Sequence, residues 1–94
     1  MSRLNRALGL LRSLWIYHGI PGRRARLLAF YRPLVPRGGL AFDIGAHVGN
    51  RTLAWRRLGA RVVAVEPQPD CLRVLQRLFA HDEAVTVLPL AVGP

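Results

Sequence analysis

The sequence predicts an α/β fold in which three parallel strands form one sheet behind an N-terminal helical extension. The prediction depends on two different patterns of hydrophobic residues along the chain. Residues 2–18 repeat apolar side chains every three or four positions, as an amphipathic helix does. Residues 40–44 and 61–65 are instead short continuous apolar runs, typical of buried parallel strands. Helical patterns at 50–58 and 70–80 alternate with the strands, and this β-α-β order with short connections implies right-handed crossovers.

The first 37 residues predict a basic, amphipathic helical extension. Its first helix covers residues 2–18, with Ser2 placed to cap it. The apolar stripe consists of Leu4, Ala7, Leu8, Leu11, Leu14, Trp15 and His18. Gly19 and Pro21 end this helix, and a second, shorter helix is expected over residues 23–32.

Residues 38–94 predict the α/β unit. Strands are expected at 40–44, 61–65 and 85–90, and helices at 50–58 and 70–80. Gly59 is placed to stop the first of these helices, and Pro89 falls inside the third strand. The expected strand order is 3-2-1, which leaves the first strand as an open edge.

The charge of the chain is concentrated in the extension. Fourteen arginines and no lysine stand against five acids, and the formal net charge is +9. Eight of the arginines precede residue 43, where there is no acid. This surplus of arginine is typical of a solvated helix face. The alternative interpretation is a surface that binds nucleic acid or anionic lipid. Because no exposed aromatic residues alternate with the arginines, we expect no nucleic-acid partner.

Cysteine usage and hydropathy favour a cytoplasmic protein. The single cysteine, Cys71, cannot form an internal disulfide, which is the pattern of a reducing compartment. No apolar run reaches the roughly 18 residues of a membrane span. Residues 7–20 have the apolar middle of a secretory signal, but Arg12 interrupts them and no small-residue cleavage site follows.

The stretch FDIGAHVGN, residues 42–50, forms the first strand-to-helix turn of the predicted sheet. Ligands bind at such turns, beyond the carboxyl ends of the strands. Gly45 and Gly49 allow a sharp bend and a close approach of the backbone to a ligand. Glu66 ends the next strand, 23 positions after Asp43, so it is expected beside the turn. A carboxylate there can accept hydrogen bonds from both hydroxyls of a ribose, which predicts a nucleoside-containing ligand.

The spacing of the glycines favours S-adenosylmethionine over a dinucleotide. The dinucleotide fingerprint G-x-G-x-x-G has a glycine where this chain has His47, and no phosphate loop is present. Asp43 suits a ligand that carries an ammonium and a sulfonium better than one that carries a pyrophosphate. A dinucleotide-binding oxidoreductase is therefore the weaker alternative.

Two motifs carry a family resemblance. D-x-G-A-x-x-G after a strand, followed by V-x-A-V-E-P at the end of the next, resembles the first two motifs of class I methyltransferases, which have a Rossmann-like fold. More narrowly, FDIGAHVGNRT, RRLGARVVAVEPQP and the closing LAVG are similar to FkbM-type methyltransferases over about residues 22–94. That resemblance implies O-methylation of a hydroxyl on a sugar or secondary metabolite, a small-molecule acceptor.

The resemblance also assigns candidate cofactor residues. It implies that Asp43, Gly45, Ala46, His47 and Gly49 line the methionine end, that Glu66 holds the ribose, and that Pro67 and Gln68 lie against the adenine. Members of that family continue well beyond the third strand, so we expect the 94 residues to be a truncated half-domain, inactive alone and prone to self-association.

Other interpretations of the same residues stay open. Asp43 could cap the following helix, and His47 is expected to contribute backbone contacts rather than act as a base. No metal site is predicted, because no second ligand residue stands at metal spacing near His47. No catalytic residue is assigned. The competing function is a non-catalytic binding fragment whose basic helix docks on a partner or a membrane surface.

Overall fold

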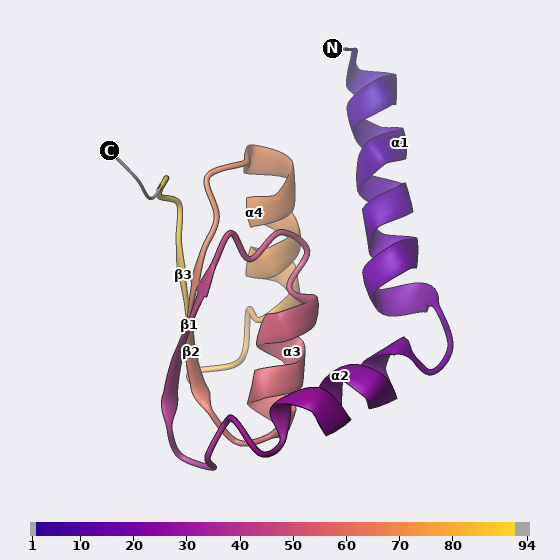
Figure 1. Cartoon of the computed structure of the whole chain (residues 1–94). Helices are drawn as coiled ribbons and strands as arrows, with labels where there is room; N and C mark the ends of the chain where they lie inside the picture. Colours follow the sequence, from indigo (N-terminus) through magenta and orange to yellow (C-terminus); the bar gives the residue numbers. More distant parts are fainter. Residues whose placement is uncertain (1, 92–94) are drawn as a thin grey trace.

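In the computed structural model, which describes residues 2–91, a parallel sheet carries α3 and α4 on the same face (Figure 1). In chain order the elements are α1 (Arg3–Leu14), the π-helical stretch η1 (Trp15–Gly19), α2 (Arg23–Tyr31), β1 (Leu40–Ile44), α3 (Asn50–Arg57), β2 (Arg61–Val65), α4 (Pro69–Leu78) and β3 (Val85–Leu88). The predicted regions 1–37 and 38–94, and the LAVG motif, extend at their ends beyond the described residues.

The sheet has the strand order β1-β2-β3 with both pairs parallel, as the sequence predicts. Leu40 pairs with Arg61 at one end of β1, and Ile44 pairs with Val65 at the other. β3 ends at Leu88 rather than at residue 90, because Pro89 has no N–H to continue the ladder. The bounds of β1 and β2 agree with the prediction.

The apolar run of β1 is typical of a buried strand, but only one of its faces is buried here, because helices cover only one face of the sheet in the described residues. Asp43 on β1 points toward the helices and is 1% exposed. Leu40, Phe42 and Ile44 alternate with it and are 60%, 58% and 50% exposed. Together these three side chains form the open apolar face of β1.

The hydrophobic core lies between the sheet and the two helices. It is built from Ala46, Ala64, Leu75 and Phe79, with Leu53, Val85 and Val87 packed around them. Leu78, the last residue of α4, is 48% exposed.

α2 is joined to α3 through aromatic side chains. Tyr31 at the end of α2 meets Trp55 of α3 edge to face, with ring centroids 5.5 Å apart. Phe30 contacts Tyr31 in the same way at 4.9 Å, although its own side chain is exposed. This contact positions the end of the extension against the α/β unit.

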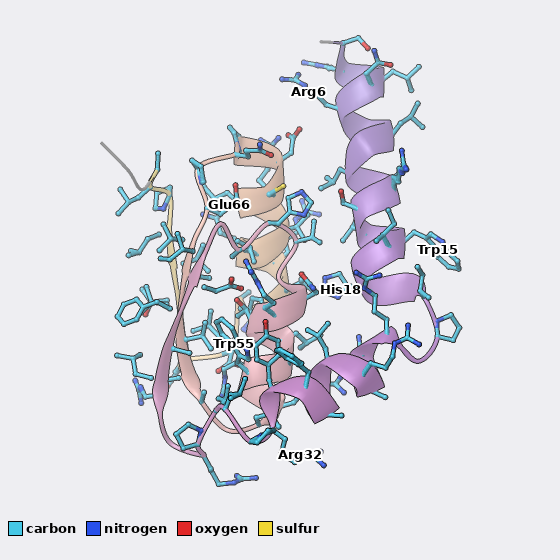
Figure 2. All side chains as sticks on the ribbon, viewed as in Figure 1. Arg6, Trp15, His18, Arg32, Trp55 and Glu66 are labelled. Atoms are coloured by element: carbon cyan, nitrogen blue, oxygen red, sulfur yellow. The ribbon has the colours of Figure 1, made fainter. Side chains whose placement is uncertain are left out.

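The apolar stripe of the first helix does not pack on the sheet. Leu4, Leu8, Leu11 and Trp15 are between 54% and 67% exposed, and Trp15 points away from the rest of the molecule in Figure 2. The opposite side of α1 faces α4. His18, predicted on the same stripe, instead points toward α3 (Figure 2), because the wider π-helical turn of η1 changes the phase of the helix after Leu14.

Candidate functional site

The glycine turn between β1 and α3 lies at the carboxyl end of the sheet. The backbone N–H groups of Gly45 and Ala46 both donate to the carbonyl of Val65, at 2.9 and 3.0 Å. The turn is therefore folded over the end of β2. This is the position at which doubly wound sheets bind ligands.

Glu66 joins the turn to the loop after β2. Its side chain is 4% exposed, and Figure 2 places it between the turn and α4. Oε1 accepts a hydrogen bond from the His47 N–H at 2.7 Å, and Oε2 accepts one from the Gln68 N–H at 2.9 Å. The spacing argument that put Glu66 beside the turn is confirmed. Its contact with a ribose stays a prediction.

Asp43 faces the first turn of α3. Its Oδ2 accepts a hydrogen bond from the Thr52 hydroxyl at 2.7 Å, and its Oδ1 lies 2.8 Å from Arg51 Nη2. Burial raises the pKa of Asp43, and the Thr52 hydroxyl and the Arg51 charge act against that rise. Arg51 also donates to the Gly45 carbonyl at 3.1 Å. These contacts favour the helix-anchoring interpretation of Asp43, and its place at a methionine end stays a prediction.

The two glycines of the turn serve different needs. Gly45 and Gly49 both have positive φ, +69° and +83°. A Cβ on Gly45 would meet nothing within 4 Å, so this glycine leaves its surroundings open. A Cβ on Gly49 would lie 2.9 Å from Leu75 and 3.1 Å from Phe79, so this glycine is needed for packing against α4. Ala46 is likewise buried in the core.

A cavity of about 560 Å³ lies between the turn and α1. It is lined by Asn5, Arg6, Gly9, Leu10 and Ser13 of α1 and by His47, Gln68, Pro69, Asp70 and Cys71. Pro67 is exposed in the loop before α4. Of the predicted cofactor residues, the structure thus brings His47 and Gln68 to this cavity. The others do not line it: Asp43, Gly45, Ala46, Gly49, Glu66 and Pro67.

His47 has a left-handed backbone, which is unusual for a residue other than glycine. Its φ is +56°, and its N–H is held by Glu66. His47 lines the cavity on the side opposite α1. The structure is consistent with a backbone role for His47, as predicted.

His18 connects the extension to the same turn. Its Nε2 lies 2.7 Å from the carbonyl of Val48, so Nε2 carries the hydrogen and donates. The sequence predicted His18 only as part of the apolar stripe, so this contact was missed, as were the roles of Arg51 and Thr52. A signal in the sequence could have found both roles. Arg51 and Thr52 come just after the turn, and a basic residue and a hydroxyl residue at the start of a helix can both bind a nearby acid such as Asp43.

Other features of the described residues bear on the predictions. Cys71 is buried, and burial first, then the charges of Glu66 and Asp70, raises the pKa of its thiol, which fits a packing residue. Among residues 2–91 no group of three or more His, Cys, Asp or Glu side chains could hold a metal ion. No helix within that range is long and apolar enough to cross a membrane.

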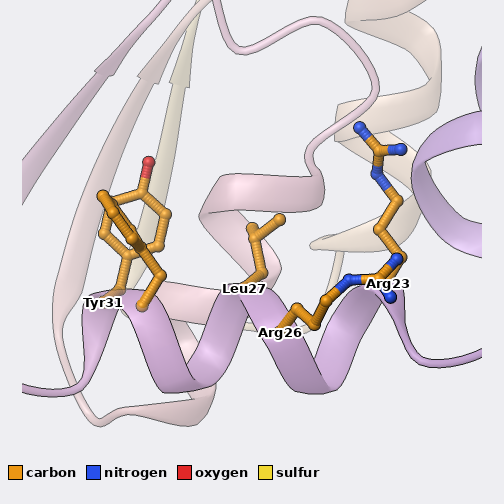
Figure 3. A pocket seen from close by; sticks show the side chains of 5 residues that line it. Arg23, Arg26, Leu27 and Tyr31 are labelled. Carbon is orange, nitrogen blue, oxygen red and sulfur yellow. The ribbon is translucent and has the colours of Figure 1, made fainter.

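A separate hollow of about 470 Å³ runs along α2 (Figure 3). It is lined by Arg23, Arg26, Leu27, Phe30 and Tyr31. All five residues come from one helix, and none belongs to the glycine turn. This hollow is therefore distinct from the cavity beside Glu66.

Solved structures similar to this chain are methyltransferases. The C-terminal domain of precorrin-6Y C5,15-methyltransferase from Rhodobacter capsulatus is 25% identical, with a TM-score of 0.61 over 73% of this chain and 38% of that one. A candidate RNA methyltransferase from Pyrococcus horikoshii is 26% identical, with a TM-score of 0.63 over 77% and 38%. The glycopeptide N-methyltransferase MtfA, solved with S-adenosyl-L-methionine, is 19% identical, with a TM-score of 0.59 over 74% and 32%.

The chain has the Rossmann-like fold of class I methyltransferases. It spans 38% of the length of the first two of these structures. Comparisons with protein-family models and with curated proteins find no match, so the narrower FkbM-type resemblance stays a prediction.

Proposed function

We propose that this chain is the cofactor-binding part of an S-adenosylmethionine-dependent methyltransferase. The observation that carries the proposal is the link between Glu66 and the glycine turn, at the carboxyl end of a sheet shared with methyltransferases. The cavity beside it has about 560 Å³, within the range of roughly 300–1,000 Å³ typical of small-molecule sites.

The residues present fit the cofactor at the ribose. Each Glu66 oxygen accepts one backbone hydrogen bond and retains a second lone pair that can accept from a ribose hydroxyl. Gly45 leaves open space for the methionine end. Gln68 lies at the start of α4 and lines the cavity, and we propose that it contacts the adenine. Pro67 is proposed beside it.

The chemistry proposed for the whole enzyme is methyl transfer to a nucleophile of a small acceptor. When bound, S-adenosylmethionine supplies an electrophilic methyl group on a sulfonium. The protein holds the two reacting atoms in line and excludes water. The FkbM-type resemblance supports a hydroxyl acceptor on a sugar or secondary metabolite. The single cysteine, Cys71, supports a cytoplasmic location.

Calorimetry with three ligands tests this proposal. S-adenosylhomocysteine, NAD and ATP are titrated separately into the purified chain. We expect S-adenosylhomocysteine to bind at least about tenfold more tightly than either of the others, a difference of about 1.4 kcal/mol. Tighter binding of NAD would contradict the proposal and favour an oxidoreductase.

A second candidate function is supported by the exposed stripe on α1. Leu4, Leu8 and Leu11 of α1 are exposed together with Trp15, the first residue of η1. α1 also carries Arg3, Arg6 and Arg12, and this combination is found in helices that lie on anionic membranes. If this candidate is right, the chain co-sediments with phosphatidylglycerol vesicles in a salt-sensitive way, and deletion of residues 1–18 abolishes binding. If α1 serves only the fold, the deletion lowers the melting temperature and neither protein binds vesicles.

A further inference from the structure

A groove between α1 and α4 is lined by arginines from both helices. It has a volume of about 780 Å³. Arg3 and Arg6 come from α1, and Arg73 and Arg77 come from α4. Figure 2 labels Arg6 on α1. Arginines on one solvated helix face would not meet across a groove, so this arrangement is more specific than the surplus of arginine in the sequence.

The positive charge of the groove is only partly balanced. Asp70 is the single acid on its walls, and it forms an ion pair with Arg73. Within residues 2–91, no ion pair joins Arg3, Arg6 or Arg77 to an acid. An anion in the groove would therefore gain charge-assisted hydrogen bonds without displacing an existing partner of these three residues.

The remaining walls indicate the size and type of that anion. They are Ala7, Leu10, Pro69 and Val74, so no aromatic side chain in the groove offers a platform for nucleic-acid bases. The groove adjoins the cavity beside the glycine turn, because Arg6, Leu10, Pro69 and Asp70 line both. An arginine-lined groove with aliphatic walls suits a small molecule that carries phosphate groups.

We propose that the groove between α1 and α4 binds the phosphate groups of a small phosphorylated molecule. The planar guanidinium of arginine matches phosphate oxygens with two parallel hydrogen bonds, and arginines on both helices allow more than one such pair. That this molecule reacts at the neighbouring cofactor rests on the proposed function. Binding of the phosphate itself does not.

Calorimetry of the full chain with inorganic pyrophosphate and with glucose 6-phosphate tests the inference. We expect both to bind, and Arg77→Glu to weaken binding by about tenfold or more. Arg3→Glu tests the opposite wall and should act in the same direction. Arg57→Glu is the matched control: it makes the same change of charge at an exposed residue of α3 outside the groove, and it should leave affinity nearly unchanged.

A substitution of opposite sign sharpens the test. Asp70→Asn removes the only acid of the groove and releases Arg73, so pyrophosphate should bind more tightly. Weaker binding in Asp70→Asn would contradict the inference. Circular dichroism confirms that each variant is folded.

Several outcomes would overturn the inference. These are no binding of pyrophosphate, equal loss in Arg57→Glu and Arg77→Glu, or an Arg77-dependent affinity for single-stranded RNA or phosphatidylglycerol vesicles that exceeds the affinity for glucose 6-phosphate. S-adenosylhomocysteine binding is measured on the same samples. If the parent chain binds pyrophosphate but not S-adenosylhomocysteine, the proposed function is rejected and the inference about the groove stands.

Discussion

The two oxygens of Glu66 hold backbone groups from both loops of the candidate site. One accepts from His47 in the glycine turn and the other from Gln68 before α4. A buried carboxylate in this position stabilises the shape of the site whether or not a ligand is bound. Its structural role and its proposed ribose contact must therefore be separated by experiment.

Glu66→Gln is expected to reduce both stability and ligand affinity. The amide retains one acceptor oxygen but leaves one of the two backbone N–H groups without a partner, at a cost of about 1–3 kcal/mol in the free energy of unfolding. S-adenosylhomocysteine affinity should fall by about tenfold or more. Urea unfolding and calorimetry measure the two effects. A loss of stability with unchanged affinity would limit Glu66 to the structural role.

Asp82 gives the fold a defined dependence on pH. Its Oδ2 accepts from Arg56 Nε at 2.7 Å, and its Oδ1 accepts from the Ala84 N–H at 3.0 Å. The hydrogen bond from Arg56 holds the pKa of Asp82 below its ordinary value of 3.8. The stability from this group is present above that ordinary value and is lost as pH falls through the lower pKa of the folded state.

Asp82→Asn should remove this part of the acid sensitivity. At pH 7 the substitution is expected to cost about 0.5–1 kcal/mol, because the side chain is partly exposed. The difference in the free energy of unfolding from the parent should shrink as pH falls below 3.8.

Asp43 acts in the opposite sense. Burial raises its pKa, so its contribution to stability weakens as pH rises above 3.8. Urea unfolding from pH 2.5 to 7 checks the sign, and a constant difference would contradict it.

At the scale of elements, the start of α3 is fixed by its packing on α4. Gly49 precedes the first residue of α3, and the absence of a Cβ lets Leu75 and Phe79 approach. Gly45 has a similar positive φ but open surroundings. Replacing each glycine by alanine therefore separates two costs in stability, that of the backbone conformation and that of overpacking.

Gly49→Ala is expected to destabilise the protein more than Gly45→Ala. Both replacements carry the conformational cost of an L-residue at positive φ, about 1 kcal/mol. Only Gly49→Ala also forces a side chain against Leu75, which adds about 1–3 kcal/mol. Thermal unfolding of the two variants measures the difference. Equal losses would argue against the packing role.

The sequence predicts elements whose pattern is local and misses arrangements that depend on distant contacts. β1, β2 and α3 were placed closely because apolar runs and Gly59 mark their limits. The solvent-facing stripe of α1 could not be predicted, since periodicity reveals an apolar face but not which side the rest of the chain covers. The π-helical turn that points His18 at Val48 has no local signal.

The same distinction applies to the candidate site. The 23-residue interval from Asp43 to Glu66 predicted their proximity to the turn, because one β-α-β step returns the chain to the same edge of the sheet. The interval could not reveal that Asp43 pairs with Arg51 or that α1 lines the cavity. Those facts depend on side-chain packing and on the path of the extension.

At the scale of the whole molecule, one face of the sheet is uncovered in the described residues. Leu40, Phe42 and Ile44 lie on that face, and β1 is one of the two edge strands of the sheet in the described residues. Arg51 donates to the carbonyl of Ile44, the last residue of β1, at 3.3 Å, so it contacts the backbone only at that end of the strand. An exposed apolar face beside an unpaired edge strand favours association.

We therefore propose that the 94-residue chain self-associates through this face. Sedimentation velocity should detect oligomers, and Phe42→Lys should shift them toward monomer by placing a charge on the face. Leu8→Lys, on the exposed stripe of α1, is the matched control and should leave the distribution unchanged. A parent that sediments as a monomer would contradict this proposal.

The most direct test of the central claim is to map the binding of S-adenosylhomocysteine on the ¹⁵N-labelled chain by NMR. If the turn, Glu66 and α1 form the cofactor site, the largest shift changes should fall on the amides of Gly45, His47, Glu66 and Gln68, with Asn5 and Ser13 of α1 also affected. Changes confined to the hollow along α2 or to the open face of β1, or no saturable change at all, would contradict the account.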